Sequence, residues 1–316
     1  MSVLQGVLPI TLTPFTDDGD VDEASIDSLV EDYLGAGAHG LTILGILGEA
    51  AKLLDDERER VLRRYVGATA GRVPVVVGIS ARATHMALDY AHRAEDAGAA
   101  AVMLAPPDNT KNLDLVFEHF RRVAEAVSVP VVVQDEPVNT GVTMPAPFLI
   151  RLLDEIEGCR YLKLEETPTL PKISVVRQRA TSQVGIFGGL GGLYLYEELL
   201  RGADGIMTGF GFPQVLVGTY ERFVAGQRDE AQEFFFRYLP LIRYEAQLGV
   251  GGVTIRKQVF ARRGSITSPH ARFPAPPVRD RRDPRGINPC DSRPCGWTAP
   301  SRPPWCARPA PPPFPR

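Results

Sequence analysis

The sequence predicts an α/β fold, a (β/α)8 barrel in which eight parallel strands alternate with helices. Eight short, largely apolar runs recur along the chain, at residues 6–15, 40–45, 73–79, 100–106, 129–135, 159–166, 184–189 and 202–209. Amphipathic stretches separate most of them, at 22–36, 55–70, 84–97, 112–127 and 146–157. This alternation is typical of a parallel sheet covered on both faces. Eight units in about 210 residues fit closure into a barrel. The second possibility is a doubly wound open sheet, and the count of eight argues against it.

The composition divides the chain into three regions. Residues 1–212 hold the barrel, residues 213–273 add C-terminal helices at 214–247 and 251–263, and residues 274–316 form a tail. The tail contains 14 of the 28 prolines and three of the four cysteines, without Lys or Glu. So much proline cannot sustain a regular helix or a central strand, and the few apolar residues cannot offset the entropy of ordering the tail. We expect a disordered tail without catalytic role, either a proline-rich arm or, the favoured interpretation, sequence read out of frame.

Charge and hydropathy exclude several classes of protein. The formal net charge of −3 argues against general binding to nucleic acid or to membrane surfaces. An 18-residue apolar run, which a membrane-spanning helix needs, does not occur. The N-terminal residues lack the basic region of a signal peptide, so we expect a cytoplasmic protein. His, Cys, Asp and Glu show no metal-ligand spacing, and no glycine-rich nucleotide loop is present, so neither a metal nor a cofactor is expected.

Chemistry in such a barrel is expected at the carboxyl ends of the strands. Of the five lysines only Lys163 lies inside a strand-like run, which reads Tyr161-Leu162-Lys163-Leu164. A lysine in a barrel interior is poorly solvated, which favours the neutral amine that can form a Schiff base with a ketone. A structural ion pair of Lys163 with Glu165 or Glu136 fits the spacing equally well.

Strand alternation selects the groups that could act beside this lysine. It puts Gln134 and Glu136 on one side of the fifth strand, and Lys163 and Glu165 on one side of the sixth. Both sides are expected to face the barrel mouth. A glutamate in a desolvated pocket can hold a proton near neutral pH and serve as acid or base, so Glu136 and Glu165 are the candidates, with Asp135 behind them. The alternative is that each acid is a solvated rim residue or a partner of Lys163.

Four motifs stand in order at the predicted strand ends. They are Gly6-Val7 through Thr13-Pro14-Phe15 in the first strand, Gly-x-x-Gly-Glu at residues 45–49, Pro-x-x-Thr-Gly at residues 137–141, and Lys163 in the sixth strand. Together they resemble the opening strand, the two loop motifs and the Schiff-base lysine of the dihydrodipicolinate synthase / N-acetylneuraminate lyase family. The resemblance covers roughly residues 5–272. It implies a class I lyase on a (β/α)8 barrel that acts on a 2-oxo acid or related ketone, and a homo-oligomer, dimer or tetramer.

This sequence departs from the family pattern at several site positions. Gln134 stands in place of a tyrosine that relays protons, and glutamine has no titratable proton. Ile46 and Leu47 replace the Thr or Ser that holds the pyruvate carboxylate, and Asn139 replaces an arginine for the second substrate. These departures predict a pocket floor more apolar than in the pyruvate-specific relatives, where carboxylate recognition rests on backbone N–H groups or is absent. The predicted substrate-binding residues are Ile46, Leu47, Asn139, Thr140, Gly188, Gly189 and Thr208.

Together these observations predict a lyase that forms a Schiff base between Lys163 and a 2-oxo acid. The reaction would be aldol cleavage or condensation, or elimination of water or ammonia, assisted by Glu136, Glu165 and Gln134. True dihydrodipicolinate synthase activity is not expected. Two alternatives stay open. In one, Lys163 acts only electrostatically in an isomerase or hydrolase. In the other, the barrel is catalytically inactive and serves as a small-anion binding or regulatory module.

Overall fold

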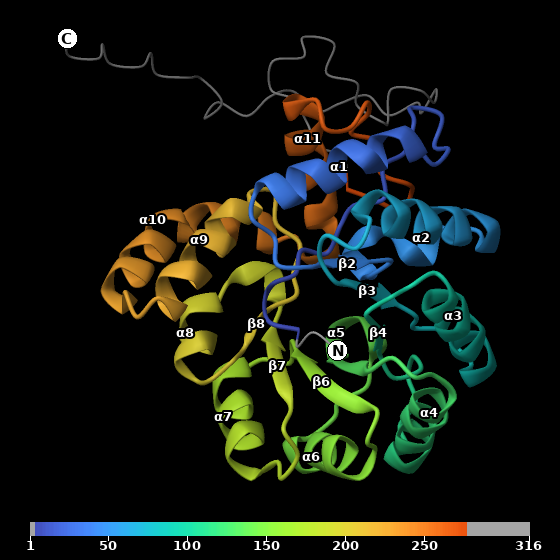
Figure 1. Ribbon diagram of the computed structural model, residues 1–316, viewed down its shortest axis with the longest axis vertical. Helices are drawn as coiled ribbons and strands as arrows, with labels where there is room; N and C mark the ends of the chain where they lie inside the picture. The colour runs from blue at the N-terminus through green and yellow to red at the C-terminus, as the bar shows by residue number, and fades with distance from the viewer. Residues whose placement is uncertain (1–3, 277–316) are drawn as a thin grey trace, which may run out of the picture. The chain divides into compact units, whose positions relative to one another are not determined.

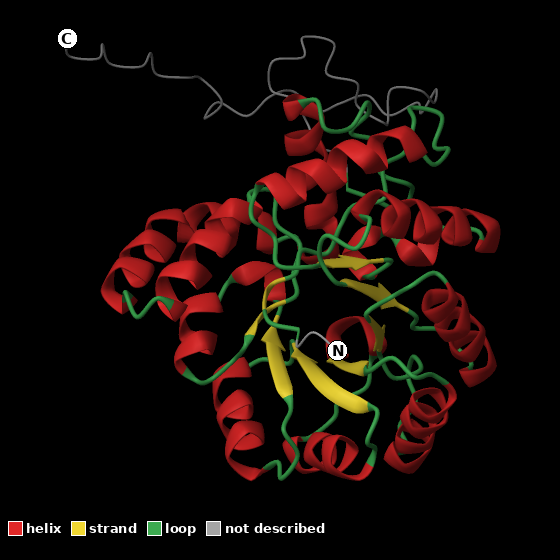
Figure 2. Ribbon diagram, viewed as in Figure 1, coloured by secondary structure: helices red, strands yellow, loops and turns green. Residues whose placement is uncertain are grey.

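Eight parallel strands form the centre of the molecule in the computed structural model, which describes residues 4–276 (Figures 1 and 2). Neighbours pair in the order β1-β8-β7-β6-β5-β4-β3-β2. A parallel bridge between Ile10 and Thr42 joins the two ends of this order, so the sheet closes into the predicted barrel. The strands are β1 (Gly6–Val7), β2 (Leu41–Ile43), β3 (Val75–Gly78), β4 (Ala101–Leu104), β5 (Val131–Asp135), β6 (Cys159–Leu164), β7 (Gly185–Gly188) and β8 (Gly205–Ile206).

Helices surround the strands, and one follows each of them (Figure 2). In order these are α1 (Glu23–Gly35), α2 (Asp55–Thr69), α3 (Thr84–Asp96), α4 (Leu113–Ala126), α6 (Ala146–Glu155), α7 (Thr169–Arg179), α8 (Leu195–Leu200) and α9 (Pro213–Val224). The additional helices are α5 (Pro137–Thr140), α10 (Arg228–Ala246) and α11 (Gly252–Arg263), with short 3-10 turns η1 (Ile46–Gly48), η2 (Ala50–Lys52), η3 (Leu190–Gly192) and η4 (Gly249–Gly251). Because α9 packs against α8 and β1, it takes the place of the outer helix of the eighth unit.

Alternation along the strands sorts apolar side chains into two layers. One set faces the barrel interior and packs together, namely Leu4, Leu8, Val76, Ala101, Met103, Val132, Tyr161, Phe187 and Met207. The intervening residues, such as Val131, Val133 and Leu162, face the helices and join a larger core. Helix α4 shows how the outer layer is built, since Val116, Phe120 and Val123 fall on one face at helical spacing and are fully buried. Polar residues in the interior layer therefore stand out.

The regular strands are shorter than the sequence suggested, and one helical stretch is divided. The first strand, expected over 6–15, is regular only at Gly6–Val7, because Pro9 has no N–H to donate to a ladder. Isolated bridges at Ile10 and Phe15 continue its course. The helical stretch expected at 214–247 divides into α9 and α10, with Gly226 at a positive φ of 82° between them.

The chain after α11 returns to the barrel, where Arg272 fixes it. The Arg272 guanidinium pairs with Glu57 and donates to the carbonyl oxygens of Gly19 and Lys52. Residues 277–316, most of the predicted tail, lie outside the described residues, so the expectation of disorder there stays a prediction. Within residues 4–276, no helix has both the length and the apolar character that crossing a bilayer requires.

Candidate active site

Lys163 projects from β6 into the barrel interior, where only 1% of its side chain is exposed. Its Nζ lies 2.8 Å from Oε2 of Glu165, two residues further along on the same face. The sheet register pairs Gln134 of β5 with Lys163, and the Gln134 amide Nε2 donates to the same Glu165 oxygen at 3.0 Å. Glu165 Oε1 accepts from the backbone N–H of Leu190 at 3.3 Å. The predicted lysine, carboxylate and amide therefore form one connected cluster.

The end of β7 comes so close to Glu165 that a glycine, Gly189, stands beside this cluster. A Cβ on Gly189 would come within 2.4 Å of Glu165 Oε1, so any larger residue there would displace the carboxylate. Gly188 faces the other side of the strand, where a Cβ would overlap a carboxyl oxygen of Glu198. The two glycines thus give room to two acids on opposite faces of β7.

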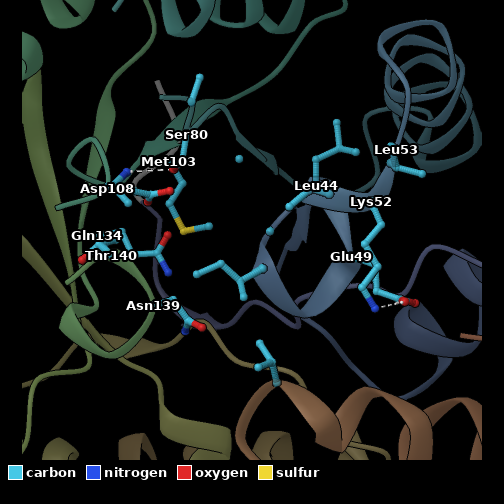
Figure 3. Close-up of a pocket in the computed structure, with 18 of the residues that line it drawn as sticks. Leu44, Glu49, Lys52, Leu53, Ser80, Met103, Asp108, Gln134, Asn139 and Thr140 are labelled. Carbon is cyan, nitrogen blue, oxygen red and sulfur yellow. Dashed lines mark hydrogen bonds and ion pairs between the residues drawn. The ribbon is translucent and has the colours of Figure 1, made fainter. Parts of the chain in front are cut away.

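A cavity of about 770 Å³ opens beside the cluster. Gln134 is one of its lining residues, so this amide connects the cavity with Glu165 and Lys163. Figure 3 shows Gln134, Thr140, Asn139 and Asp108 on one side of the cavity and Lys52 with Glu49 on the other. The surface between them is mainly apolar, from Leu44, Ile46, Met103, Ala105, Pro106 and Val253. A chamber of this size, apolar with a few polar groups, suits a small-molecule ligand.

The predicted site residues fall into two groups around this cavity. Gln134, Ile46, Asn139 and Thr140 line it. Outside the lining are Lys163, Glu165, Glu136, Leu47, Gly188, Gly189 and Thr208. Lys163 and Glu165 lie directly behind Gln134. Thr208 is buried at the end of β8, where its hydroxyl meets no hydrogen-bond partner among the described residues.

Glu136 has a structural contact that sequence reasoning did not supply. Its carboxylate caps the short helix α5 by accepting the Asn139 N–H at 2.8 Å. Burial raises the pKa of Glu136, and the Asn139 contact opposes that rise. Glu136 therefore shapes the loop that carries Asn139 and Thr140, two of the cavity-lining residues.

Sequence reasoning missed a second charged cluster, on the outer face of the same strands. Lys172 of α7 pairs with Asp135 at 2.6 Å and with Glu166. Burial raises the pKa of Asp135 to about 6, although the Lys172 ammonium acts in the opposite direction. Nearby, Glu198 of α8 is fully buried, and burial raises its pKa to about 8 against a smaller lowering by the Thr169 hydroxyl. These acids lie between the sheet and α7 or α8, behind the candidate site.

Glu49 joins the cavity wall to the C-terminal part of the chain. Its carboxylate pairs with Lys52 at 2.9 Å and with the buried Lys257 of α11 at 2.6 Å, and it accepts the Arg272 N–H at 3.1 Å. Burial lowers the pKa of Lys257 to about 8, with Glu49 opposing the change. These contacts agree with a structural role for this motif glutamate. Among residues 4–276, no group of three or more His, Cys, Asp or Glu side chains could hold a metal ion.

The fold and the interior lysine at the end of β6 define a class of barrel proteins, and sequence comparison identifies the family within it. The family model "Dihydrodipicolinate synthetase family" matches residues 3–285. The chain therefore belongs to this family, whose members are lyases.

Two sequence relatives and one crystal structure show which known proteins the chain is similar to. An L-2-keto-3-deoxyarabonate dehydratase from Azospirillum brasilense is 34% identical over 277 residues, which cover 86% of this chain and 89% of that protein. A 4-hydroxy-tetrahydrodipicolinate synthase from Methanothrix thermoacetophila is 33% identical over 245 residues, 76% of this chain and 81% of the relative. The crystal structure of dihydrodipicolinate synthase from Rhodopseudomonas palustris aligns with a TM-score of 0.83 at 40% identity, covering 88% of this chain and 93% of that chain.

Proposed function

We propose that this protein is a Schiff-base lyase that acts on a 2-oxo acid through Lys163. The observation that carries the proposal is the buried Lys163–Glu165 pair, which Gln134 links to a ligand-sized cavity. A lysine amine that attacks a ketone gives a protonated imine, which acts as an electron sink and allows a carbanion to form at the adjacent carbon.

Glu165 is suited to move the protons of this reaction. Its Oε2 lies within hydrogen-bond distance of Lys163 Nζ, so it can take the proton that the ammonium must lose before the amine attacks C2 of the substrate. The carbonyl oxygen leaves as water when the imine forms. Gln134 cannot titrate, and its amide instead donates to Glu165 and holds the carboxylate in place.

The carboxylate of the 2-oxo acid would be held by backbone groups rather than by hydroxyls. Ile46 lines the cavity, and η1 begins at this residue. The first amide N–H groups of a helical turn have no acceptor within that turn, so they are free to donate to a carboxylate. This arrangement supports the expectation of an apolar floor with backbone recognition.

Among the reactions open to the imine, we favour loss of water from a 2-oxo acid with a hydroxyl on C4. Removal of a proton from C3 gives an enamine, and the C4 hydroxyl then leaves with a proton to form a C3–C4 double bond. The dehydratase of Azospirillum brasilense, 34% identical, supports this choice. Aldol cleavage starts from the same imine but breaks the C3–C4 bond. We further expect a cytoplasmic homo-oligomer, as the family resemblance implies.

The test is borohydride trapping with 4-hydroxy-2-oxopentanoate and pyruvate, read by intact mass and peptide mapping. A reduced adduct adds the mass of the acid less one oxygen atom, and we expect it on Lys163. Lys163→Met should abolish the adduct, whereas Lys172→Met, which alters a lysine on the outer face of the sheet, should retain it. Formation of 2-oxopent-3-enoate indicates dehydration, and pyruvate with acetaldehyde indicates aldol cleavage. Ligand binding without an adduct contradicts the proposal and favours the inactive binding module.

A further inference from the structure

The cavity extends well beyond the space that a three-carbon acid at Lys163 would fill. From Gln134 of β5 it reaches across Met103 to the β3–α3 loop and the neighbouring helices, where Arg58, Tyr90 and Met86 line it. Its volume of about 770 Å³ falls in the range of pockets that enclose drug-sized ligands. The outer part of the cavity, formed by residues 80–82 with Lys52, Arg58, Met86 and Tyr90, is therefore available to the far end of a longer substrate.

Two of the three cations in this outer part are already engaged. Lys52 donates to Glu49 and to the carbonyl oxygen of Arg272. Arg58 donates to the carbonyl oxygen of Gly78 and stacks on Tyr90, 4.2 Å from the ring centroid. These contacts hold the Lys52 and Arg58 side chains against the cavity wall.

Arg82 differs from them. It is exposed at the cavity, and within residues 4–276 it makes no recorded hydrogen bond or ion pair, so its planar fork of donors is available. Ser80, two residues earlier, accepts the Ala105 N–H at 2.9 Å, which leaves its own hydroxyl hydrogen free to donate. A guanidinium with a neighbouring hydroxyl suits a carboxylate or phosphate oxygen pair.

We propose that the substrate carries a second anionic group at its far end, which Arg82 and Ser80 bind while Lys163 holds C2. The inference rests on the proposed function, which supplies the end of the substrate at Lys163. It defines the substrate class as an extended 2-oxo acid whose apolar middle crosses Met103 and Ile46.

Matched pairs of acids test the proposal, because each pair differs only at the terminal carbon. The half-saturating concentration for borohydride trapping is measured for 2-oxoglutarate against 2-oxopentanoate, and for 2-oxoadipate against 2-oxohexanoate. We expect the diacid of at least one pair to saturate at a concentration roughly 10-fold or more lower. Arg82→Gln should remove this preference and leave trapping of the monoacids unchanged. Ser80→Ala should reduce it less, and Arg122→Gln on the exposed face of α4 is the control.

The outcomes separate this inference from the proposed function. Trapping on Lys163 without a diacid preference, or a preference that survives Arg82→Gln, overturns the inference alone. Absence of any adduct overturns the proposed function, and calorimetry with glutarate then decides the anion site, since that diacid has no ketone. Weaker glutarate binding in Arg82→Gln supports the site. If inorganic phosphate instead promotes trapping of 2-oxopentanoate, the site takes a free ion and the inference about the substrate is wrong.

Discussion

Two charged clusters lie on opposite faces of β5 and β6, and each contains a lysine paired with a buried carboxylate. On the interior face, Lys163 contacts Glu165 at 2.8 Å. On the outer face, Lys172 contacts Asp135 at 2.6 Å. The distance between the lysine and its carboxylate therefore does not separate a candidate catalytic lysine from a structural one.

The surroundings of the two pairs do separate them. Glu165 accepts a hydrogen bond from Gln134, which lines the cavity, whereas Lys172, Asp135 and Glu166 do not line it. The outer pair lies between the sheet and α7, where it ties a helix to two strand ends. The alternation of residues along a strand decides which face a side chain takes, and the interior face is the one that reaches the cavity through Gln134.

The largest effect should come from Glu165→Gln, which removes the proton acceptor of the interior pair. We expect turnover to fall by roughly 10²- to 10⁴-fold, because general acid–base catalysis contributes on that scale. The chemical step should be measured by single-turnover kinetics with 4-hydroxy-2-oxopentanoate. Glu136→Gln is the matched change, and its effect should be smaller because Glu136 caps α5. Equal losses in both variants would show that Glu165 has no special role.

Lys172→Met should break the outer pair and affect stability rather than chemistry. It leaves Asp135 fully buried without its cation, and removal of one partner of a buried pair costs roughly 3–5 kcal/mol. Chemical denaturation gives the free energy of unfolding, and borohydride trapping per folded molecule should stay near wild type. The double variant Asp135→Asn/Lys172→Met should recover much of the loss. Loss of trapping in folded Lys172→Met would mean that the outer pair also serves the reaction.

The sequence could predict the interior pair because local patterns determine it. Eight apolar runs identify the barrel, and a period of two places Glu165 on the face of Lys163. Adjacent fifth and sixth strands then bring Gln134 beside them. The outer cluster has no such signal, since Lys172 belongs to a helix 37 residues after Asp135. The same holds for the pairing of Glu49 with Lys257, which depends on how α11 folds back on the barrel.

Two further features of the fold could not be predicted from the order of residues along the chain. The predicted barrel ends at residue 212, which assigns α9 to the C-terminal extension. In the structure, α9 packs on β1. The contact joins the last helix of the barrel to its first strand, and only closure of the sheet creates it. Pro274 and Pro276 belong by composition to the tail, yet they line the cavity. The composition of a segment indicates how readily the segment becomes ordered. It does not reveal the contacts that the first residues of the segment make.

Glu198→Gln should change the pH dependence of stability, with a smaller effect than Lys172→Met. Burial raises the pKa of Glu198 from an ordinary 4.5 to about 8, so the folded protein favours the protonated acid. In the wild type, stability should fall as pH rises from about 4.5 to about 8, because folding then works against ionisation. The neutral glutamine removes this cost, a gain of at most roughly 3 kcal/mol at pH 7. Thermal unfolding at pH 5, 7 and 8 should show a gain that grows with pH, and a constant difference would contradict it.

The smallest effect should come from removing residues 277–316. The contacts that fix the end of the described chain come before this point, since Arg272 pairs with Glu57 and Pro274 and Pro276 lie against the cavity. A chain ending at Pro276 should therefore keep its melting temperature within a few degrees and trap a 2-oxo acid on Lys163 as the full chain does. A chain ending at Gly264 is the matched control, because it also loses the Arg272 contacts to Glu57, Gly19 and Lys52. It should melt markedly lower and expose the cavity. If instead the chain ending at Pro276 loses trapping or stability, residues 277–316 contribute to the fold, and the expectation from composition is wrong.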